Sequence, residues 1–368
     1  MTSKVLILGG YGNFGKRIAQ SLVKHNISVI IAGRSRVKAH SFAQTLPESL
    51  ATVAVLDIAY EFAQQLKLLK PTVVINTCGP FQNSNYDVAR ACIEHKVHYI
   101  DLADGRDFVT GITALDEAAK AHQVAIISGA STVPGLSSAV IEHYQYEFSD
   151  IDSLIFGISP GQQAERGLAT TQSILTYVGK PLKPFAGATK PVYGWQDIYR
   201  QKYPELGKRW MANCDIPDLD LLPPRYRIRS IRFSAGLELG FMHLGLWLLS
   251  WTVRLGLPLH LPRYAAILLA VSNWFDHFGT AHGGMHMILR GKNQEGRPHE
   301  RSWFIIAKKG DGPQIPTIPT IVLAKKLVNG CLNYRGATPC VGMVELEEYL
   351  NELKGFSVRS YETSTSRS

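Results

Sequence analysis

Apolar runs and amphipathic stretches alternate along the first 130 residues of the chain. The short runs are rich in Val, Ile and Leu and have the length of buried strands, and helical apolar spacing follows most of them. The predicted strands are 4–9, 27–33, 51–56, 71–76, 97–102 and 124–127. This alternation predicts an α/β fold that begins with a Rossmann-type, doubly wound parallel sheet covered by helices on both faces.

The first strand runs into a glycine-rich turn. Gly10, Gly12 and Gly15 satisfy G-x-G-x-x-G, and a helical pattern begins at Lys16. A strand, this turn and a helix in succession are typical of a dinucleotide site. We expect Gly10 to permit the tight turn, Gly12 to let the backbone approach a pyrophosphate, and Gly15 to let the helix pack closely. An ordinary glycine-rich turn is the alternative.

The amides at the start of that helix are the predicted phosphate ligands. They belong to Gly12, Asn13, Phe14 and Gly15. Unbonded N–H groups and the helix dipole both favour an anion at such a position.

The end of the second strand distinguishes between the two nicotinamide cofactors. A NAD site usually carries an acid there for the ribose 2′-hydroxyl, but this chain reads Gly33-Arg34-Ser35-Arg36. Arg34 is placed to form a bidentate pair with a 2′-phosphate, and Ser35 can add a hydroxyl. The sequence therefore predicts NADP. The alternative is that Arg34 and Arg36 belong to a solvated helix start.

Two further loops follow predicted strands at the same edge of the sheet. Asp57 ends the third strand and could accept from an adenine amino group or cap the helix that begins near Ala59. After the fourth strand comes a turn that we expect to line the cofactor crevice, with Cys78 a packed residue more often than a nucleophile. That turn consists of Cys78, Gly79, Pro80 and Phe81.

Length and composition add a second domain and exclude some classes of function. A chain of 368 residues exceeds one usual core. We expect an NADP-binding domain at 1–133 and a mixed α/β domain for substrate binding or dimerisation at 134–368. The net charge is +9, yet no nucleic-acid-binding motif is present. The five cysteines form no C-x-x-C pair, which argues against disulfides and structural zinc.

Four stretches in order resemble the saccharopine dehydrogenase-like family of NADP-dependent oxidoreductases. They are 9–15 with 33–35, then 78–81, then His98-Tyr-Ile-Asp101-Leu, then Gly129-Ala-Ser-Thr-Val-Pro-Gly135. The resemblance implies a Rossmann domain joined to a mixed α/β domain, bound NADP, and hydride transfer at a carbon–nitrogen centre. It covers the first 140 residues well and the remainder loosely. Gly129 and Ala130, in the last stretch, are further candidate cofactor contacts.

The candidates for catalysis follow the fifth strand. Asp101 and Asp104 lie just beyond its carboxyl end and are candidates for handling a proton, while Arg106 could orient an anionic substrate. Asp and Arg are also common turn and cap residues. Many relatives carry Gly-Glu after the Asp-Leu pair, where this chain has Ala103-Asp104. That departure affects the chemistry expected of this loop.

The second half of the chain contains candidate substrate ligands and a basic segment. Arg166 and Thr170, near a predicted helix start, could bind a carboxylate, or could belong to a capped helix with a surface arginine. Residues 180–232 contain eleven Lys or Arg against five Asp or Glu. We expect 225–233, where basic and apolar residues alternate, to be a half-exposed strand.

The most unusual stretch is 239–275, which is almost without charge. It predicts two apolar helices, each shorter than the ~20 residues that span a bilayer. The hairpin could be core, a homodimer surface, or a segment in contact with a membrane or lipid surface. His282 and His286 follow at a spacing that suits a metal on a helix, but strand-like alternation there favours no metal site.

The leading hypothesis is an NADP-dependent oxidoreductase that acts on a small-molecule substrate. The alternative is a nucleotide-binding scaffold that docks on membrane or lipid with little turnover. The first strand starts directly after Met1-Thr-Ser, so we expect a cytoplasmic protein, with peripheral membrane contact as the variant. The polar tail 362–368 is expected to lack regular structure. The sequence does not name the substrate.

Overall fold

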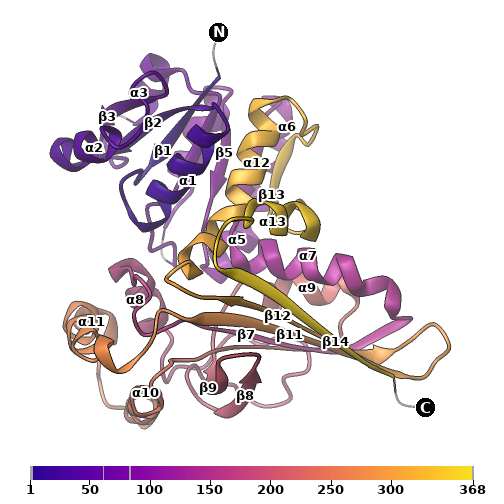
Figure 1. The fold of residues 1–368 in the computed structure, drawn as a ribbon. Helices are drawn as coiled ribbons and strands as arrows, with labels where there is room; N and C mark the ends of the chain where they lie inside the picture. The colour runs from indigo at the N-terminus through magenta and orange to yellow at the C-terminus, as the bar shows by residue number, and fades with distance from the viewer. Residues whose placement is uncertain (1–2, 61, 83, 367–368) are drawn as a thin grey trace. The chain divides into compact units, whose positions relative to one another are not determined.

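The computed structural model describes residues 3–60, 62–82 and 84–366. This part of the chain divides into two compact units (Figure 1). The first unit is Met1–Ala139 with Gln314–Glu352, and the second is Val140–Pro313 with Leu353–Ser368. The segment Gln314–Glu352, which the sequence-based boundary at residue 133 assigns to the second domain, thus lies in the first unit.

The sheet of the first unit is entirely parallel. Its strands lie in the order β13 (Gly336–Pro339), β6 (Ala125–Ser128), β5 (His98–Asp101), β4 (Val73–Asn76), β1 (Lys4–Leu8), β2 (Ser28–Gly33) and β3 (Ala51–Val55). Every neighbouring pair is parallel, as the alternating pattern predicted. Because the strands are parallel, all their carboxyl ends lie at one edge of the sheet. Open α/β sheets bind their ligands in a crevice at that edge.

Helices cover both faces of this sheet. They are α1 (Asn13–Lys24), α2 (Arg36–Ala43), α3 (Phe62–Leu69), α4 (Asp87–Glu94), α5 (Arg106–Gly111), α6 (Asp116–Ala121), α12 (Ile318–Val328) and α13 (Leu346–Glu352). Leu6, Val74 and Ile126 point to the face that α3, α4 and α6 cover. On the other face α1 packs beside α12. Burial on both faces explains why these strands read as continuous apolar runs.

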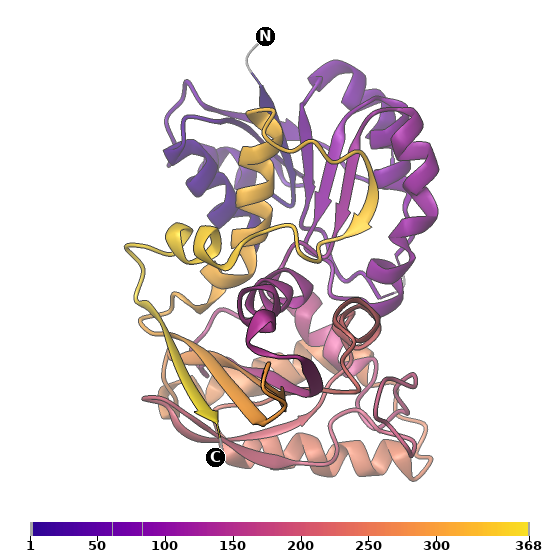
Figure 2. The same cartoon turned by 90° about the vertical axis from the view of Figure 1, so that its right-hand side faces the viewer.

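The last strand of this sheet comes from far along the chain. β13 pairs with β6, and Figure 2 shows it as the yellow strand beside the purple ones. The backbone N–H of Ala337 also donates to Asp116 Oδ1 of α6 (2.9 Å). The segment 314–352 therefore supplies both an edge strand and a covering helix to the first unit.

The second unit is built on a mixed sheet. Its strands lie in the order β14 (Val358–Ser366), β12 (Pro298–Ala307), β11 (Gly283–Lys292), β7 (Asp150–Ser159), β10 (Ser230–Ala235), β9 (Gly207–Asn213) and β8 (Tyr199–Tyr203). Only the β7–β10 pair among them is parallel within the described residues. The predicted mixed α/β architecture is confirmed.

Two sequence-based expectations for this unit are wrong. Instead of one strand over 225–233, α9 (Asp218–Tyr226) ends there, Arg227 takes a left-handed conformation (φ 54°), and β10 begins at Ser230. Likewise, residues 362–366 of the tail are not irregular, because β14 pairs along its length with β12, while 367–368 lie outside the described residues. Backbone pairing to an edge strand needs no apolar side chains, so a polar sequence gave no signal of it.

The apolar stretch forms two helices, α10 (Gly240–Arg254) and α11 (Ala265–Trp274), joined through the 3-10 helix η4 (Leu261–Tyr264). One side of α10 packs on a small core that includes Trp195, Leu175 and Leu261. Within the described residues, no helix has the length and apolar character needed to cross a membrane.

Candidate functional site

The glycine-rich turn packs so tightly that it leaves no room for side chains at Gly9, Gly10 and Gly15. A Cβ on Gly15 would lie 2.3 Å from the Gly9 carbonyl oxygen, so Gly15 permits the predicted close approach of α1 to the end of β1. The left-handed residue of the turn is Gly9 (φ +72°) rather than Gly10. Gly10 instead makes room for Ile31, whose Cγ2 would lie 3.1 Å from an added Cβ.

The first turn of α1 has the features of a phosphate cradle. Gly12 is the N-cap and makes no side-chain cap hydrogen bond. Its own N–H donates to the Gly9 carbonyl (2.8 Å), so it is not a free phosphate ligand as the sequence suggested. The amides of Phe14 and Gly15, in the first turn of the helix, have no carbonyl partner within it. Since only the Gly9 oxygen lies within 4 Å of a Cβ on Gly12, a pyrophosphate can approach this backbone.

Arg34 and Ser35 lie at the carboxyl end of β2, as predicted. Arg34 is exposed, and Ser35 is the N-cap of α2, with its Oγ accepting from the Lys38 N–H (3.4 Å). The hydroxyl hydrogen of Ser35 thus remains able to donate to a phosphate. The residues present fit a 2′-phosphate, because a guanidinium and a hydroxyl occupy the end of the strand.

Tyr11 is a site residue that the sequence analysis missed. Its Oη accepts from the backbone N–H of Ser35 (3.0 Å), and a Cβ on Gly33 would lie 2.5 Å from its ring. The phenol therefore bridges the glycine-rich turn and the loop that carries Arg34. The sequence shows only that an aromatic residue lies within the turn, and its backbone partner on another loop leaves no local pattern.

Cys78 and Asp57 lie at the same edge as Arg34. Burial raises the pKa of the Cys78 thiol to about 11, with Arg34 lowering it and Asp57 raising it. Cys78 is thus a protonated, packed thiol at neutral pH, in line with the structural alternative. Asp57 Oδ1 accepts from the Ala59 N–H (3.1 Å) within a turn, and α3 begins only at Phe62, so this side chain does not cap a helix near Ala59.

The loop after β4 packs against the loop after β5. A Cβ on Gly105 would lie 3.2 Å from the Phe81 carbonyl, and the Phe81 ring is buried against Phe108 (5.2 Å between centroids). Gln82 Nε2 donates to Asp104 Oδ1 (3.0 Å). The turn with Gly79 and Pro80 therefore supports the β5 loop, and Phe81 is a packing residue rather than an exposed cofactor contact.

Asp101 is a buried hydrogen-bond centre between strand ends. Its Oδ1 accepts from Ser128 Oγ (2.9 Å) and from the N–H groups of Gly129 (2.8 Å) and Ala103 (3.0 Å). Burial raises its pKa to about 6, against the lowering effect of these hydrogen bonds. The N–H of Ala130 donates to the Asp101 carbonyl (2.8 Å), so the amides of Gly129 and Ala130 are engaged inside the unit.

Arg106 starts α5 and is 4% exposed, whereas Asp104 is half-buried. Arg106 therefore does not present its guanidinium to solvent as a substrate-orienting group would. Among the predicted catalytic residues, Asp104 is the one that remains accessible.

In the second unit, Arg166 is engaged with the end of α11. Its guanidinium forms an ion pair with Asp276 and donates to Ser272 Oγ (2.6 Å) and Asn273 Oδ1 (2.9 Å). Thr170 is exposed on α8 (Leu168–Leu175), whose N-cap is Gly167. These contacts match the capped-helix alternative more closely than a free carboxylate site.

The histidines after the apolar hairpin are on a strand, not a helix. His286 lies in β11, fully buried, with Nδ1 2.8 Å from Tyr203 Oη, and burial lowers its pKa to about 3. Within 3–60, 62–82 and 84–366, no cluster of three His, Cys, Asp or Glu is placed to hold a metal ion.

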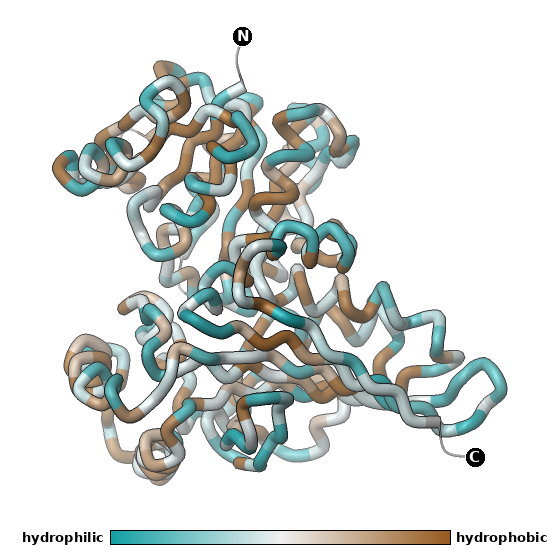
Figure 3. The backbone as a smooth tube through the Cα atoms, in the orientation of Figure 1, coloured by the Kyte–Doolittle hydropathy of each residue, from teal (hydrophilic) through white to brown (hydrophobic). Residues whose placement is uncertain are grey.

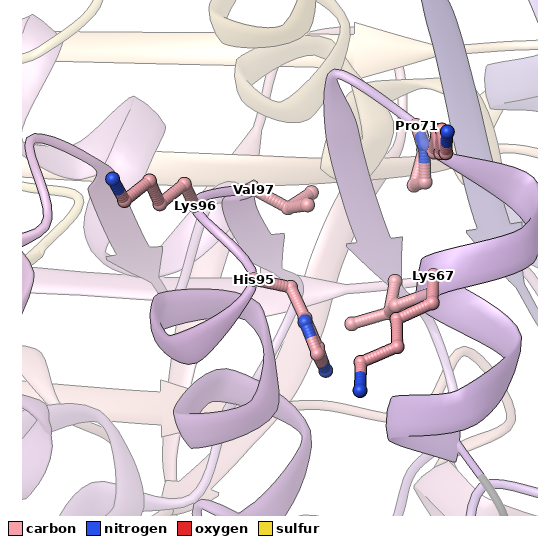
Figure 4. Close-up of a pocket in the computed structure, with 7 residues that line it drawn as sticks. Lys67, Pro71, His95, Lys96 and Val97 are labelled. Carbon is pink, nitrogen blue, oxygen red and sulfur yellow. The ribbon is translucent and has the colours of Figure 1, made fainter.

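A separate hollow lies at the opposite edge of the first sheet. It has a volume of about 380 Å³, and its lining includes Pro71 and Val97, just before β4 and β5. The side chains of Lys67 and His95 point toward each other across it (Figure 4). Because nucleotides bind at the carboxyl ends of the strands, this amino-end hollow is not the cofactor site.

Part of the first unit matches a known protein family. Residues 5–130 match the family model described as the saccharopine dehydrogenase NADP binding domain. The match confirms the predicted resemblance, the NADP cofactor and the oxidoreductase class. No curated protein matches the sequence.

One solved structure shows a similar fold along nearly the whole chain. Apo saccharopine dehydrogenase (L-Glu forming) from Saccharomyces cerevisiae matches with a TM-score of 0.68 and 13% identity, over 98% of this chain and 100% of that one. An amine dehydrogenase from Mycobacterium smegmatis matches with a TM-score of 0.48 and 13% identity, over 93% of this chain and 95% of that one. At such identity the first likeness concerns the fold alone.

Proposed function

We propose that this chain, whose first unit carries an NADP-binding domain of the saccharopine dehydrogenase type, transfers hydride at a carbon–nitrogen centre of a small amino or imino acid. The observation that carries the cofactor preference is the exposed Arg34 next to Ser35, at a strand end without an acid. The domain match supports the reaction class, and the substrate class rests on what its family name implies.

The nicotinamide, when bound, supplies the hydride acceptor or donor. The chain's own residues do the rest. The start of α1, with the amides of Phe14 and Gly15, binds the pyrophosphate, and Arg34 with Ser35 binds the 2′-phosphate. Asp104 exchanges a proton with the reacting nitrogen, since it is accessible beside the loops that end β4 and β5.

Asp101, Gly129 and Ala130 act as positioning residues in this proposal. Asp101 ties the end of β5 to the loop after β6, so it fixes the wall of the cofactor crevice rather than touching substrate. Arg106 likewise anchors the start of α5 from a buried position. For Arg166, the pairing with Asp276 supports a structural role, and Thr170 remains the more accessible candidate for a substrate carboxylate.

The cofactor assignment is tested by titrating NADPH and NADH against wild type, Arg34→Ala and Arg36→Ala. Loss of a charge-assisted pair with the 2′-phosphate should weaken NADPH binding by about 10–100-fold and leave NADH unchanged. Arg36 is also exposed but is the first residue of α2, beyond the strand end, so its variant is the matched control. Equal weakening in both variants would mean a diffuse charge effect and would refute the specific site.

Turnover is tested by following NADPH formation from amino acids with NADP⁺, and NADPH loss with oxo acids and ammonia. On any substrate found, Asp104→Asn should lower kcat by about 100-fold or more with unchanged NADPH affinity. Asp107→Asn, an exposed neighbour on α5, is the control. Full activity of Asp104→Asn would remove Asp104 from the proton step.

The alternative is an NADP-binding scaffold with little turnover. The exposure of many apolar side chains between 241 and 278 favours it. Tight NADPH binding without turnover on any amino, imino or oxo acid would support the scaffold and overturn the enzymatic proposal.

A further inference from the structure

The apolar helices of the second unit leave an apolar surface exposed. In the described part of the chain, eleven of the seventeen large apolar side chains that are exposed lie between Phe241 and Phe278. The surfaces of soluble monomeric proteins carry such residues singly, and a contiguous apolar patch marks an interaction site. Figure 3 colours most of α10 and α11 from white to brown, the apolar end of the scale.

The exposed residues form a stripe on each helix. On α11 and its flanks, the apolar side chains that face solvent recur every three or four residues. They are Tyr264, Ile267, Val271, Trp274 and Phe278. On α10 and its end they are Phe241, Leu248, Trp251 and Leu255. A surface helix normally turns its polar face outward, so these helices present the opposite arrangement.

The two helices that carry the stripes pack on the same small core, and an apolar loop joins them. The ring of Phe241, at the start of α10, lies 5.2 Å from that of Phe275, just after α11, so the helices run as a hairpin. Figure 1 draws both nearly end-on. The connection exposes Leu255, Leu257 and Leu259. We name residues 241–278 the hairpin surface.

The charges on and around the hairpin surface are positive, apart from Asp276 near its end, which is paired with Arg166. Between Leu239 and Phe275 the chain contains Arg254 and Arg263 but no Asp or Glu. Lys180 is exposed and follows Gly179, which packs against Ser250 of α10. At the other end of α10, Arg200 stacks on Trp210, the side chain nearest Gly240.

The acids that flank this segment are neutralised from within the unit. Glu238 pairs with the buried Arg209 (3.1 Å), and Asp276 pairs with Arg166. No uncompensated acid therefore offsets the cations of the hairpin surface at its two ends. An apolar stripe edged by cations complements anionic lipid headgroups above acyl chains.

We propose that the hairpin surface docks this protein in the interface of an anionic lipid bilayer. The helices are ~22 and ~15 Å long, too short to cross a ~30 Å hydrocarbon core, so they lie along the interface. Trp251, Trp274 and Tyr264 have the amphipathic rings that favour this depth. A symmetric second copy would instead bring together two surfaces that both carry net positive charge.

The test is flotation of the full-length protein with vesicles of phosphatidylcholine alone or mixed with phosphatidylglycerol. Binding should require phosphatidylglycerol and weaken as salt is raised. Trp274→Ser with Leu255→Ser should lower the partition coefficient by about tenfold or more. Val37→Ser with Leu68→Ser is the control, because Val37 matches Leu255 (79% exposed) and Leu68 matches Trp274 (72% exposed).

A measurement on wild type avoids dependence on the variants. Tryptophan emission should shift to the blue on binding and be quenched by brominated acyl chains. Absence of flotation overturns the proposal, and so does equal binding to neutral vesicles. A dimer in light scattering that dissociates in the Trp274→Ser, Leu255→Ser variant, without lipid binding, would assign the surface to a second copy. NADPH binding is unaffected in every case, so this test is independent of the enzymatic proposal.

Discussion

Gly15 permits the close approach of α1 to the end of β1, and that distance sets the geometry of the phosphate cradle. An added methyl group would lie 2.3 Å from a backbone oxygen, which cannot move without breaking the turn. Gly245, inside the exposed part of α10, has no atom within 4 Å of the same position. The two glycines therefore respond to the same substitution in opposite ways.

We predict that Gly15→Ala lowers the unfolding free energy by about 1–3 kcal/mol and weakens NADPH binding. Gly245→Ala should raise the unfolding free energy by roughly 0.5–1 kcal/mol, because alanine restricts the unfolded chain and favours helix. Urea unfolding of both variants with and without NADPH measures this. A stable, NADPH-binding Gly15→Ala protein would show that the turn relaxes.

The raised pKa of Asp101 makes the unfolding free energy depend on pH. The pKa of Asp101 is about 6 in the folded protein, and its usual value is 3.8. At pH values between these two, the folded state therefore binds more protons than the unfolded state. The unfolding free energy therefore falls as pH rises through that window, by up to about 3 kcal/mol from this residue. In Asp101→Asn this fall should disappear, as urea unfolding between pH 4 and about 6 would reveal. A variant with the wild-type slope would refute the link.

At the scale of elements, strands and helices with local signals could be predicted. The run from β1 through α1 to β2 reads directly, because burial on both faces leaves apolar runs and the turn chemistry is in adjacent residues. β8, with the sequence Tyr-Arg-Gln-Lys-Tyr, has no such pattern. β13, Gly-Ala-Thr-Pro, is held by pairing with β6, a partner that no local pattern reveals.

The residues of the candidate site also divide into those with a local sequence signal and those without one. Gly15 and Arg34 act through their own position in a local motif, so their placement was predictable. The role of Asp101 depends on Ser128 and Gly129, which reach it only after the sheet forms. Tyr11 was missed because its partner is a backbone N–H on another loop. Contacts of that kind leave no mark in the sequence of either segment.

The attachment of β13 provides a prediction at this scale. Asp116 of α6 accepts from the Ala337 N–H, so Asp116→Ala should leave that N–H unpaired and lower the unfolding free energy by about 1 kcal/mol. Hydrogen exchange of the β13 amides should accelerate, while β1 stays protected. Glu117→Ala removes the exposed neighbour that also pairs with Lys120 and serves as the control. Equal acceleration in β1 would indicate global rather than local opening.

For the whole molecule, buried neutral histidines oppose the effect of Asp101. Burial lowers the pKa of His98 and His243 to about 4 and that of His286 to about 3. A lowered histidine pKa contributes stability that is fully present above the unfolded value of 6.5 and is lost as pH falls below it. Each lowered histidine pKa changes the unfolding free energy by about 3 kcal/mol or more. Together the three histidines therefore have a larger effect on the pH dependence of stability than Asp101.

The protein should therefore lose stability from pH 7 to pH 4. His243→Phe keeps a ring against Trp195 but cannot be protonated, so its acid midpoint should move to lower pH. His40→Ala, an exposed histidine on α2, should leave the midpoint unchanged. Circular dichroism against pH checks both, and an unmoved midpoint in His243→Phe would exclude that residue as a cause.

The late arrival of β13 has a consequence for synthesis on the ribosome. β6 emerges with residue 128, but its outer neighbour begins at Gly336, roughly 200 residues later. At about 5–20 residues per second, the nascent chain holds an open, apolar strand edge for about 10–40 s. Through that interval residues Val140–Pro313, most of the second unit, must be translated, so the nucleotide-binding sheet is begun first but completed only after them. A stalled or truncated chain thus exposes an adhesive edge that the completed protein never presents.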